Sequence, residues 1–164
     1  MEKYSSGLLD ILQNQTNIYR QLLSLALEKR PVLIKGNIIE LERITKEEES
    51  LIFKVGRLEE QRQALHNALA NHFALSPEEL SISELIKRVD EPLKIKFTKI
   101  YDEITEILGQ ITEVNNNNTD LINSSLDFVS FSLNLLTSHS TVPSYTEEEN
   151  EKRQAAAKIF DRTV

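Results

Sequence analysis

Histidines and carboxylates are the side chains of this sequence that could bind a metal ion or transfer protons. The histidines are His66, His72 and His139, and no Glu lies three residues before any of them. His66 and His72 are six residues apart, so on a helix they diverge, whereas helical metal-ligand pairs are spaced by three or four residues. The pattern therefore predicts no metal site. We expect His72 to be a hydrogen-bonded histidine in a helix interface.

The sequence also lacks the motifs of nucleophilic and phosphate-transfer enzymes. Ser124, Ser125 and Ser130 lie in a helical pattern without a neighbouring histidine, so no activated hydroxyl is indicated. The glycines are isolated and form no phosphate-binding loop. The absence of cysteine excludes disulfides, thiolate metal sites and cysteine nucleophiles. The sequence predicts a protein that is not an enzyme and binds no cofactor.

Length and charge limit the classes of partner. A chain of 164 residues is most simply one folded domain. Its net charge of -7 argues against nucleic acid, since phosphate binding needs clustered Lys and Arg. The first residues show no signal-peptide pattern, and no apolar run approaches the ~20 residues that span a bilayer. We therefore expect a cytoplasmic protein without a membrane span, whose partners are other proteins.

Long helices are the elements that must position any binding site. From Leu93 to Leu135, mostly apolar residues recur at alternating steps of four and three, as in a helix packed lengthwise on others. Residues 6–35 and about 38–73 carry similar apolar faces. Between them, Gly36 suits a left-handed helix end, and Asn37 suits an N-cap that Glu40 would complete as a capping box.

Several positions predict local departures from straight helices. Gln15 interrupts the apolar face of the first helix. Pro31 removes a backbone donor late in that helix, so we expect a kink near Leu27 or an early end. Ser76-Pro77-Glu78-Glu79 has the pattern of a helix start, and residues 77–89 are expected to form one or two short helical turns.

The resulting prediction is an all-α fold. It is an elongated antiparallel bundle or coiled coil of three long helices, with a short helical connector and a C-terminal amphipathic helix. The bundle would comprise residues 1–136, followed by a polar linker, 137–146. Residues 147–164 would carry the amphipathic helix, which begins at a third capping box formed by Thr146 and Glu149.

The end of the long helix has more apolar surface than one packing seam requires. Besides the seam, a second stripe recurs at steps of four and three: Ile122, Leu126, Val129, Leu133 and Leu136. A second stripe needs a further layer, which could be the helix at 6–35, the C-terminal segment, a second copy or another protein. The residue pattern alone leaves these open. Upstream, the four asparagines 115–118 are weak helix formers and mark a soft point in the helix.

Three stretches resemble the FlgN family of flagellar export chaperones: residues 28–48 around the Gly36-Asn37 junction, the short turn 82–86, and residues 121–129. In order, they cover about residues 5–136, and Pro31 departs from the pattern expected in the family. The resemblance implies a bundle of long antiparallel helices without enzymatic activity. It also implies cytoplasmic binding of the hook-associated (hook-filament junction) proteins FlgK and FlgL before type III export, with export apparatus components as further partners.

Client binding in this family involves the C-terminal region, which directs attention to the second stripe and the tail. The candidate protein-binding residues are Ile122, Leu126, Val129, Phe131, Leu133, Leu136, Tyr145, Ala156, Ile159 and Phe160. We expect the stripe to receive an amphipathic client helix, and helix 147–161 to dock on the same stripe in the free protein. The alternative is a homo-oligomeric structural coiled coil, such as a homodimer, or a helical adaptor.

Overall fold

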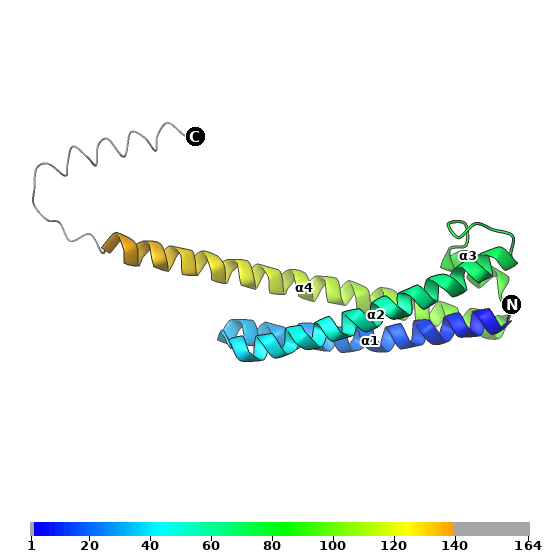
Figure 1. The fold of residues 1–164 in the computed structure, drawn as a ribbon, viewed down its shortest axis with the longest axis horizontal. Helices are drawn as coiled ribbons and strands as arrows, with labels where there is room; N and C mark the ends of the chain where they lie inside the picture. Colours follow the sequence, from blue (N-terminus) through cyan, green and yellow to red (C-terminus); the bar gives the residue numbers. More distant parts are fainter. Residues whose placement is uncertain (1, 140–164) are drawn as a thin grey trace, which may run out of the picture. The chain divides into compact units, whose positions relative to one another are not determined.

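Helices are the only regular secondary structure in the described part of the chain. The structure, a computed structural model, describes residues 2–139. These residues form α1 (Glu2–Lys35), α2 (Ile38–His72), α3 (Ile82–Arg88) and α4 (Glu91–His139), as Figure 1 shows. The prediction of an all-α fold is confirmed. The expected capping box at Thr146, helix 147–161 and most of the expected linker lie outside the described residues.

The junction between α1 and α2 satisfies the ends of both helices within two residues. Gly36, at φ 64°, donates its N–H to the carbonyl of Leu33 at 3.1 Å, and Asn37 donates to Val32 at 3.2 Å. This pair of bonds is a Schellman motif, which closes the C-terminus of α1. The Asn37 side chain then accepts from the N–H of Glu40 at 3.2 Å and caps α2.

Two details of this junction differ from the sequence-based expectations. The expectation that the first helix ends early at Pro31 is wrong, because α1 continues through the proline to Lys35. The expectation that the Glu40 side chain would accept a hydrogen bond from the Asn37 N–H is also wrong. That N–H already donates to the Val32 carbonyl. The Glu40 carboxylate instead accepts from Arg43 at 2.7 Å.

Side-chain contacts define the direction of each long helix relative to α1. Gln15 Nε2 donates to Glu59 at 3.3 Å, while Lys29 Nζ lies 2.5 Å from Glu48. Residue numbers that increase along α1 therefore face residue numbers that decrease along α2. The two helices are therefore an antiparallel hairpin, lying side by side (Figure 1).

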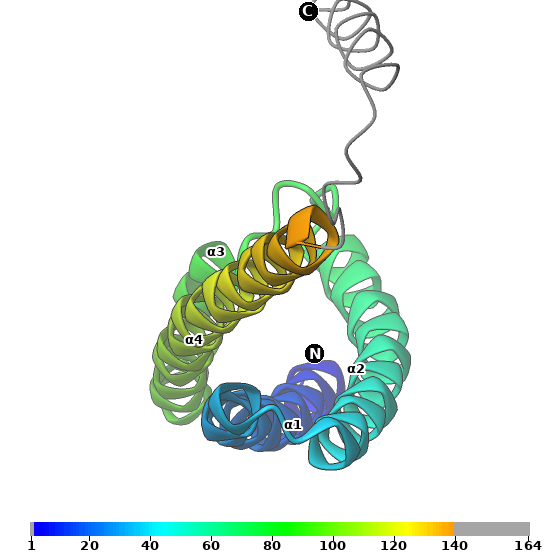
Figure 2. The ribbon, with the colours of Figure 1, turned by 90° about the vertical axis from the view of Figure 1, so that its left-hand side faces the viewer.

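The first part of α4 follows α1 in the same direction. Arg20 forms an ion pair with Glu103, and Ala26 is bonded to Asn118. Residue numbers therefore increase in the same direction along both helices, so the two are parallel. Seen end-on in Figure 2, α1 has α2 on one side and the start of α4 on the other.

Two apolar clusters stabilise this arrangement. One joins α1, α2, α3 and α4 around fully buried side chains that include Leu8, Leu69 and Phe97. The other joins α1 to α2 through Leu25, Ile44 and Leu51. Burying such side chains contributes about 1.5–3 kcal/mol each, so the clusters fix the hairpin and the α4 start as one packed unit.

The connector before α4 contains a short helix, as its sequence predicts, but the helix does not begin at the Ser76 start signal. Ser76 and Glu79 form a reciprocal capping box, in which Ser76 N–H donates to the Glu79 carboxylate at 2.8 Å and Glu79 N–H donates to the Ser76 hydroxyl at 3.3 Å. However, residues 77–79 form a turn, and the helix begins only at Ile82, behind the N-cap Ser81. Buried Leu80 and Leu85 attach this connector to the core.

Candidate protein-binding surface

The apolar seam of α4 passes from buried to exposed along its length. From Leu93 to Leu121 every seam position is buried or half-buried. From Ser125 onward the seam is exposed except at half-buried Ser132. The first part of the helix is thus packed core, and residues 125–137 present the same pattern to solvent.

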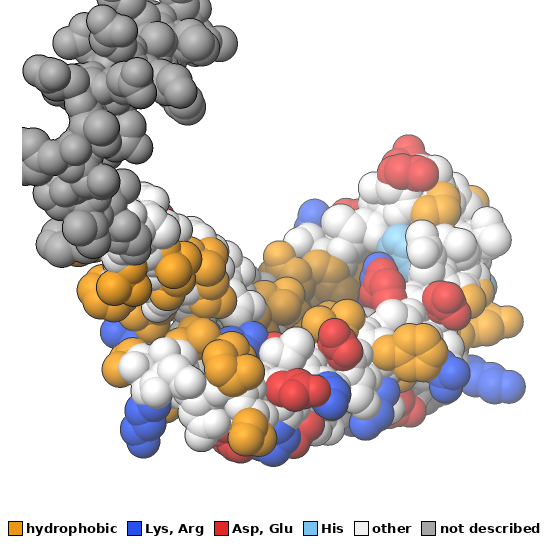
Figure 3. All heavy atoms as spheres, turned by 60° about the vertical axis from the view of Figure 1, so that its left-hand side comes forward, with side chains coloured by type: hydrophobic (Ala, Val, Ile, Leu, Met, Phe, Trp, Pro, Cys, Tyr) orange, Lys and Arg blue, Asp and Glu red, His pale blue; other side chains and the backbone are white. Residues whose placement is uncertain are grey.

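The exposed part of α4 is densely apolar and almost uncharged. Its exposed fractions range from 40% to 69%: Ile122 40%, Leu126 60%, Phe128 69%, Val129 52%, Phe131 61%, Leu133 56%, Leu135 46% and Leu136 68%. Between Leu121 and Thr137 the only acidic or basic side chain is Asp127. Figure 3 shows hydrophobic side chains gathered near the C-terminal end of α4. This part of α4 therefore offers mainly apolar contact.

The second stripe lies along one side of α4. Leu126, Val129 and Leu133 are spaced by three and four residues, so their side chains share a helical face. Phe128 and Phe131 are spaced by three and lie on another side. We name the exposed set Leu126, Phe128, Val129, Phe131 and Leu133 the α4 apolar surface.

The structure places six of the ten candidate binding residues on the exposed end of α4. These are Ile122, Leu126, Val129, Phe131, Leu133 and Leu136. The remaining candidates, Tyr145, Ala156, Ile159 and Phe160, lie outside the described residues. Phe128 was missed because its seam position predicted burial in the core, although it has the largest exposed fraction of this group.

Asn118 is the last fully buried position of the α4 seam. Its side chain is 3% exposed. Its Nδ2 donates to the Ala26 carbonyl at 2.8 Å, and its Oδ1 has no hydrogen-bond partner among residues 2–139. An apolar residue here would have continued the hydrophobic contact between α1 and α4. The helix therefore reaches its exposed end through a polar contact that is only half satisfied.

Electrostatic contacts inside the hairpin are structural. Gln15 is 2% exposed, and its amide donates to Glu59, which also accepts two bonds from Arg62 at 2.7 and 2.6 Å. These bonds, chiefly those from Arg62, lower the pKa of Glu59 below its ordinary value. Burial, followed by the charge of Glu59, raises the pKa of Tyr19. The interruption of the apolar face at Gln15 is thus a buried polar link between α1 and α2.

The histidines occupy other roles than those expected. His66 Nε2 lies 2.7 Å from the Leu80 carbonyl and ties α2 to the connector. His72, expected in a hydrogen-bonded interface, is exposed, and its ring meets Phe73 edge-on at 5.5 Å. Within residues 2–139, no cluster of His, Asp and Glu is placed to hold a metal ion. No helix in that stretch is long and apolar enough to cross a bilayer.

Comparison with known proteins gives one finding. The family model described as FlgN protein matches residues 1–153. The matched range includes all four helices and Tyr145, whereas Ala156, Ile159 and Phe160 fall beyond it. No curated protein and no solved structure matches the chain.

Proposed function

The chain belongs to the FlgN family of flagellar export chaperones, and on this premise we propose that its clients are hook-associated proteins of the FlgK and FlgL type. It would hold them in the cytoplasm before export and prevent their premature assembly. Components of the export apparatus would be further partners. The family supports the general chaperone role, and the surface chemistry of α4 supports the mode of client binding.

The observation that carries the proposal is the α4 apolar surface. Its five side chains are 52–69% exposed within residues 126–133 of one helix. Apolar surface of this density is typical of a site that another protein covers. An amphipathic client helix would lay its apolar face along Leu126, Val129 and Leu133, whereas Phe128 and Phe131, on another side of α4, would contact a different part of the client. Covering the client helix would keep it from pairing with other subunits.

The rest of the chain would act as a scaffold and a tail. We propose that α1, α2 and α4 form an elongated antiparallel three-helix bundle within residues 1–136. The linker 137–146 would then lead to an amphipathic helix in 147–164. In the free protein this helix would dock on the second stripe, and client binding would displace it. Residues Tyr145, Ala156, Ile159 and Phe160 would supply the apolar side of the tail.

A second candidate function also rests on the second stripe. If the α4 apolar surface of one copy met that of another, the protein would be a homodimeric coiled coil or a helical adaptor. Sedimentation at micromolar concentration distinguishes the two. A monomer with full client binding supports the chaperone, and a tight dimer that Val129→Ser separates supports the alternative.

The direct test is binding of purified FlgK-type and FlgL-type proteins. Leu126→Ser should weaken client affinity on the order of tenfold, since a central apolar contact contributes about 1–2 kcal/mol. Ile52→Ser is the matched control, because Ile52 is also 60% exposed but lies on α2. Equal affinities of the two variants would refute binding at the α4 apolar surface. No binding of either client by the unmodified chain would refute the client assignment.

A further inference from the structure

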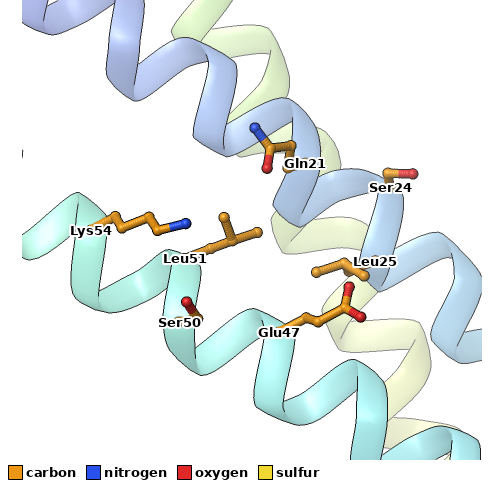
Figure 4. A pocket seen from close by; sticks show the side chains of 7 residues that line it. All are labelled: Gln21, Ser24, Leu25, Glu47, Ser50, Leu51 and Lys54. Atoms are coloured by element: carbon orange, nitrogen blue, oxygen red, sulfur yellow. The ribbon is translucent and has the colours of Figure 1, made fainter.

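A shallow groove between α1 and α2 lies apart from the α4 residues considered so far. It has a volume of about 310 Å³ and is open to solvent. Figure 4 shows its walls: Gln21, Ser24 and Leu25 come from α1, and Glu47, Ser50, Leu51 and Lys54 come from α2. The small side chains of Ser24 and Ser50 leave the space between the two helices unfilled. Leu25 and Leu51, each 8% exposed, form an apolar floor.

The charges at the two ends of the groove are not equivalent. Glu47 accepts a hydrogen bond from Arg43 at 2.6 Å, but Arg43 also pairs with Glu28 and Glu40, so this end of the groove is acidic. Lys54 extends along the groove toward Leu51 (Figure 4), and it forms no ion pair among the described residues. The groove therefore presents an unpaired positive charge at one end of an apolar floor, on a chain whose net charge is -7.

The next turn of α2 adds a second oriented cation. The Arg57 guanidinium lies over the ring of Phe53, with its carbon 4.6 Å from the ring centroid. Phe53 is 63% exposed, so the stack is on the surface. Stacking uses the face of a guanidinium and leaves its in-plane N–H groups directed outward, where they suit a carboxylate. Lys54 and Arg57, three residues apart on a helix, lie on neighbouring positions.

From this chemistry we propose that the groove is a second protein-binding site, which takes an acidic apolar segment of a partner protein. One apolar side chain would enter between Ser24 and Ser50 and rest on Leu25 and Leu51. A carboxylate next to it in the partner would pair with Lys54, and a second would reach Arg57. This site goes beyond the proposed client surface, since it uses α1 and α2 and selects by charge, whereas the α4 apolar surface is almost uncharged.

The test uses the full-length chain labelled with nitrogen-15 and a short amphipathic peptide of Leu, Ala and Glu. A counterpart peptide has Lys in place of each Glu. The acidic peptide should shift the amide resonances of Ser24, Leu25, Ser50 and Leu51 in a saturable way. The basic peptide should bind on the order of tenfold more weakly, the change that about 1.4 kcal/mol produces.

Charge reversal at the groove separates specific from general attraction. Lys54→Glu should abolish the preference for the acidic peptide. Lys46→Glu makes the same charge change on α2, at an exposed residue whose partner is Glu42 and which does not line the groove, and should preserve the preference. Ser50→Trp should fill the groove and block the acidic peptide.

Several outcomes would overturn the groove proposal. These are no resonance shifts in the groove, equal shifts with both peptides, or equal effects of Lys54→Glu and Lys46→Glu. Shifts confined to residues 122–137 would also overturn it, while leaving the proposed client surface standing. Conversely, loss of client binding by Leu126→Ser with an intact peptide preference would leave the groove proposal standing.

Discussion

Asn118 of α4 donates its amide to the carbonyl of Ala26 in α1 at 2.8 Å, at a point where both residues are buried. Ala26 is small, so the helices approach closely enough for a side chain to reach the backbone. The carbonyl of Ala26 also belongs to the helical ladder of α1, so it does not depend on Asn118. By contrast, Asn118 Oδ1 is buried without a hydrogen-bond partner in the described part of the chain, which is unfavourable.

Asn118→Leu should therefore stabilise the protein. The variant removes a buried unsatisfied oxygen and continues the apolar seam, so the free energy of unfolding should rise by about 1 kcal/mol. Urea denaturation followed by circular dichroism measures it. Asn117→Leu is the control: Asn117 belongs to the same asparagine run but is exposed, so its change should stay within about 0.5 kcal/mol. A stability loss in Asn118→Leu would mean that the amide bond outweighs the unsatisfied oxygen.

A single polar residue in a helical seam also selects the register. In Asn118→Leu, α4 loses its buried hydrogen bond to Ala26, while the exposed Arg20–Glu103 ion pair remains. We expect the variant to show broader or doubled amide resonances in α4 despite its higher stability. A single sharp set of resonances would show that the remaining contacts, including the Arg20–Glu103 ion pair and the apolar contacts of Phe97 and Ile100, are sufficient to fix the register.

The pattern of the sequence predicted which residues of the first part of α4 face the core, but not where the burial ends or which residues meet. The α4 seam from Leu93 to Leu121 is buried or half-buried as its periodicity indicates. Periodicity carries no information about the partner opposite each position, so neither the Asn118–Ala26 bond nor the Gln15–Glu59 bond was foreseen. In the sequence, Gln15 and Asn118 are polar interruptions of an apolar face. In the structure, each forms a hydrogen bond between two helices.

Local backbone motifs were predicted well where a backbone group had a single possible hydrogen-bond partner. Gly36 takes the left-handed conformation and Asn37 caps α2, as expected. The capping box failed because two partners compete for one N–H group, and the Schellman bond to Val32 prevails. At Ser76 the box forms without a helix behind it. The local pattern specifies the turn, while the start of α3 is determined by Ser81 and buried Leu85.

Gly36→Ala should destabilise the hairpin through backbone strain alone. Gly36 has a φ of 64°, and a Cβ added there meets no atom within 4 Å. The cost is therefore the left-handed conformation itself, about 1–2 kcal/mol. Gly109→Ala is the matched control, since its Cβ also meets nothing within 4 Å but the residue lies inside α4. It should raise stability by about 0.5–1 kcal/mol. Thermal unfolding of both variants measures these effects. If the two melting temperatures shifted in the same direction, backbone strain at Gly36 would not explain the result.

The Glu59 contacts predict a pH dependence of stability. Arg62, and then Gln15, lower the pKa of Glu59 below its ordinary value of 4.5 in the folded protein. A lowered folded pKa stabilises the protein above the unfolded pKa, and this stabilisation is lost as pH falls through the folded pKa. Glu59→Gln should thus be less stable than the unmodified protein at pH 7, and the difference should shrink between about pH 5 and about pH 3.

Urea denaturation at a series of pH values measures this difference. Glu60→Gln provides the control, because Glu60 is the adjacent residue on α2 and is exposed. Its difference from the unmodified protein should be small and should not share the same pH profile. A difference for Glu59→Gln that stays constant from neutral to acidic pH would show that the carboxylate charge plays no part.

The tail prediction concerns residues 140–164, which follow α4 directly. If helix 147–161 docks on the second stripe, its covalent attachment gives it a high effective concentration there. Ending the chain after His139 should then change client affinity and raise the hydrogen-exchange rates of residues 126–133 in the free protein. Phe160→Ala separates two mechanisms. It should weaken client binding if the tail contacts the client, and strengthen it if the tail only competes. Unchanged affinity in both variants would show that the tail has neither role, leaving the α4 apolar surface to bind clients alone.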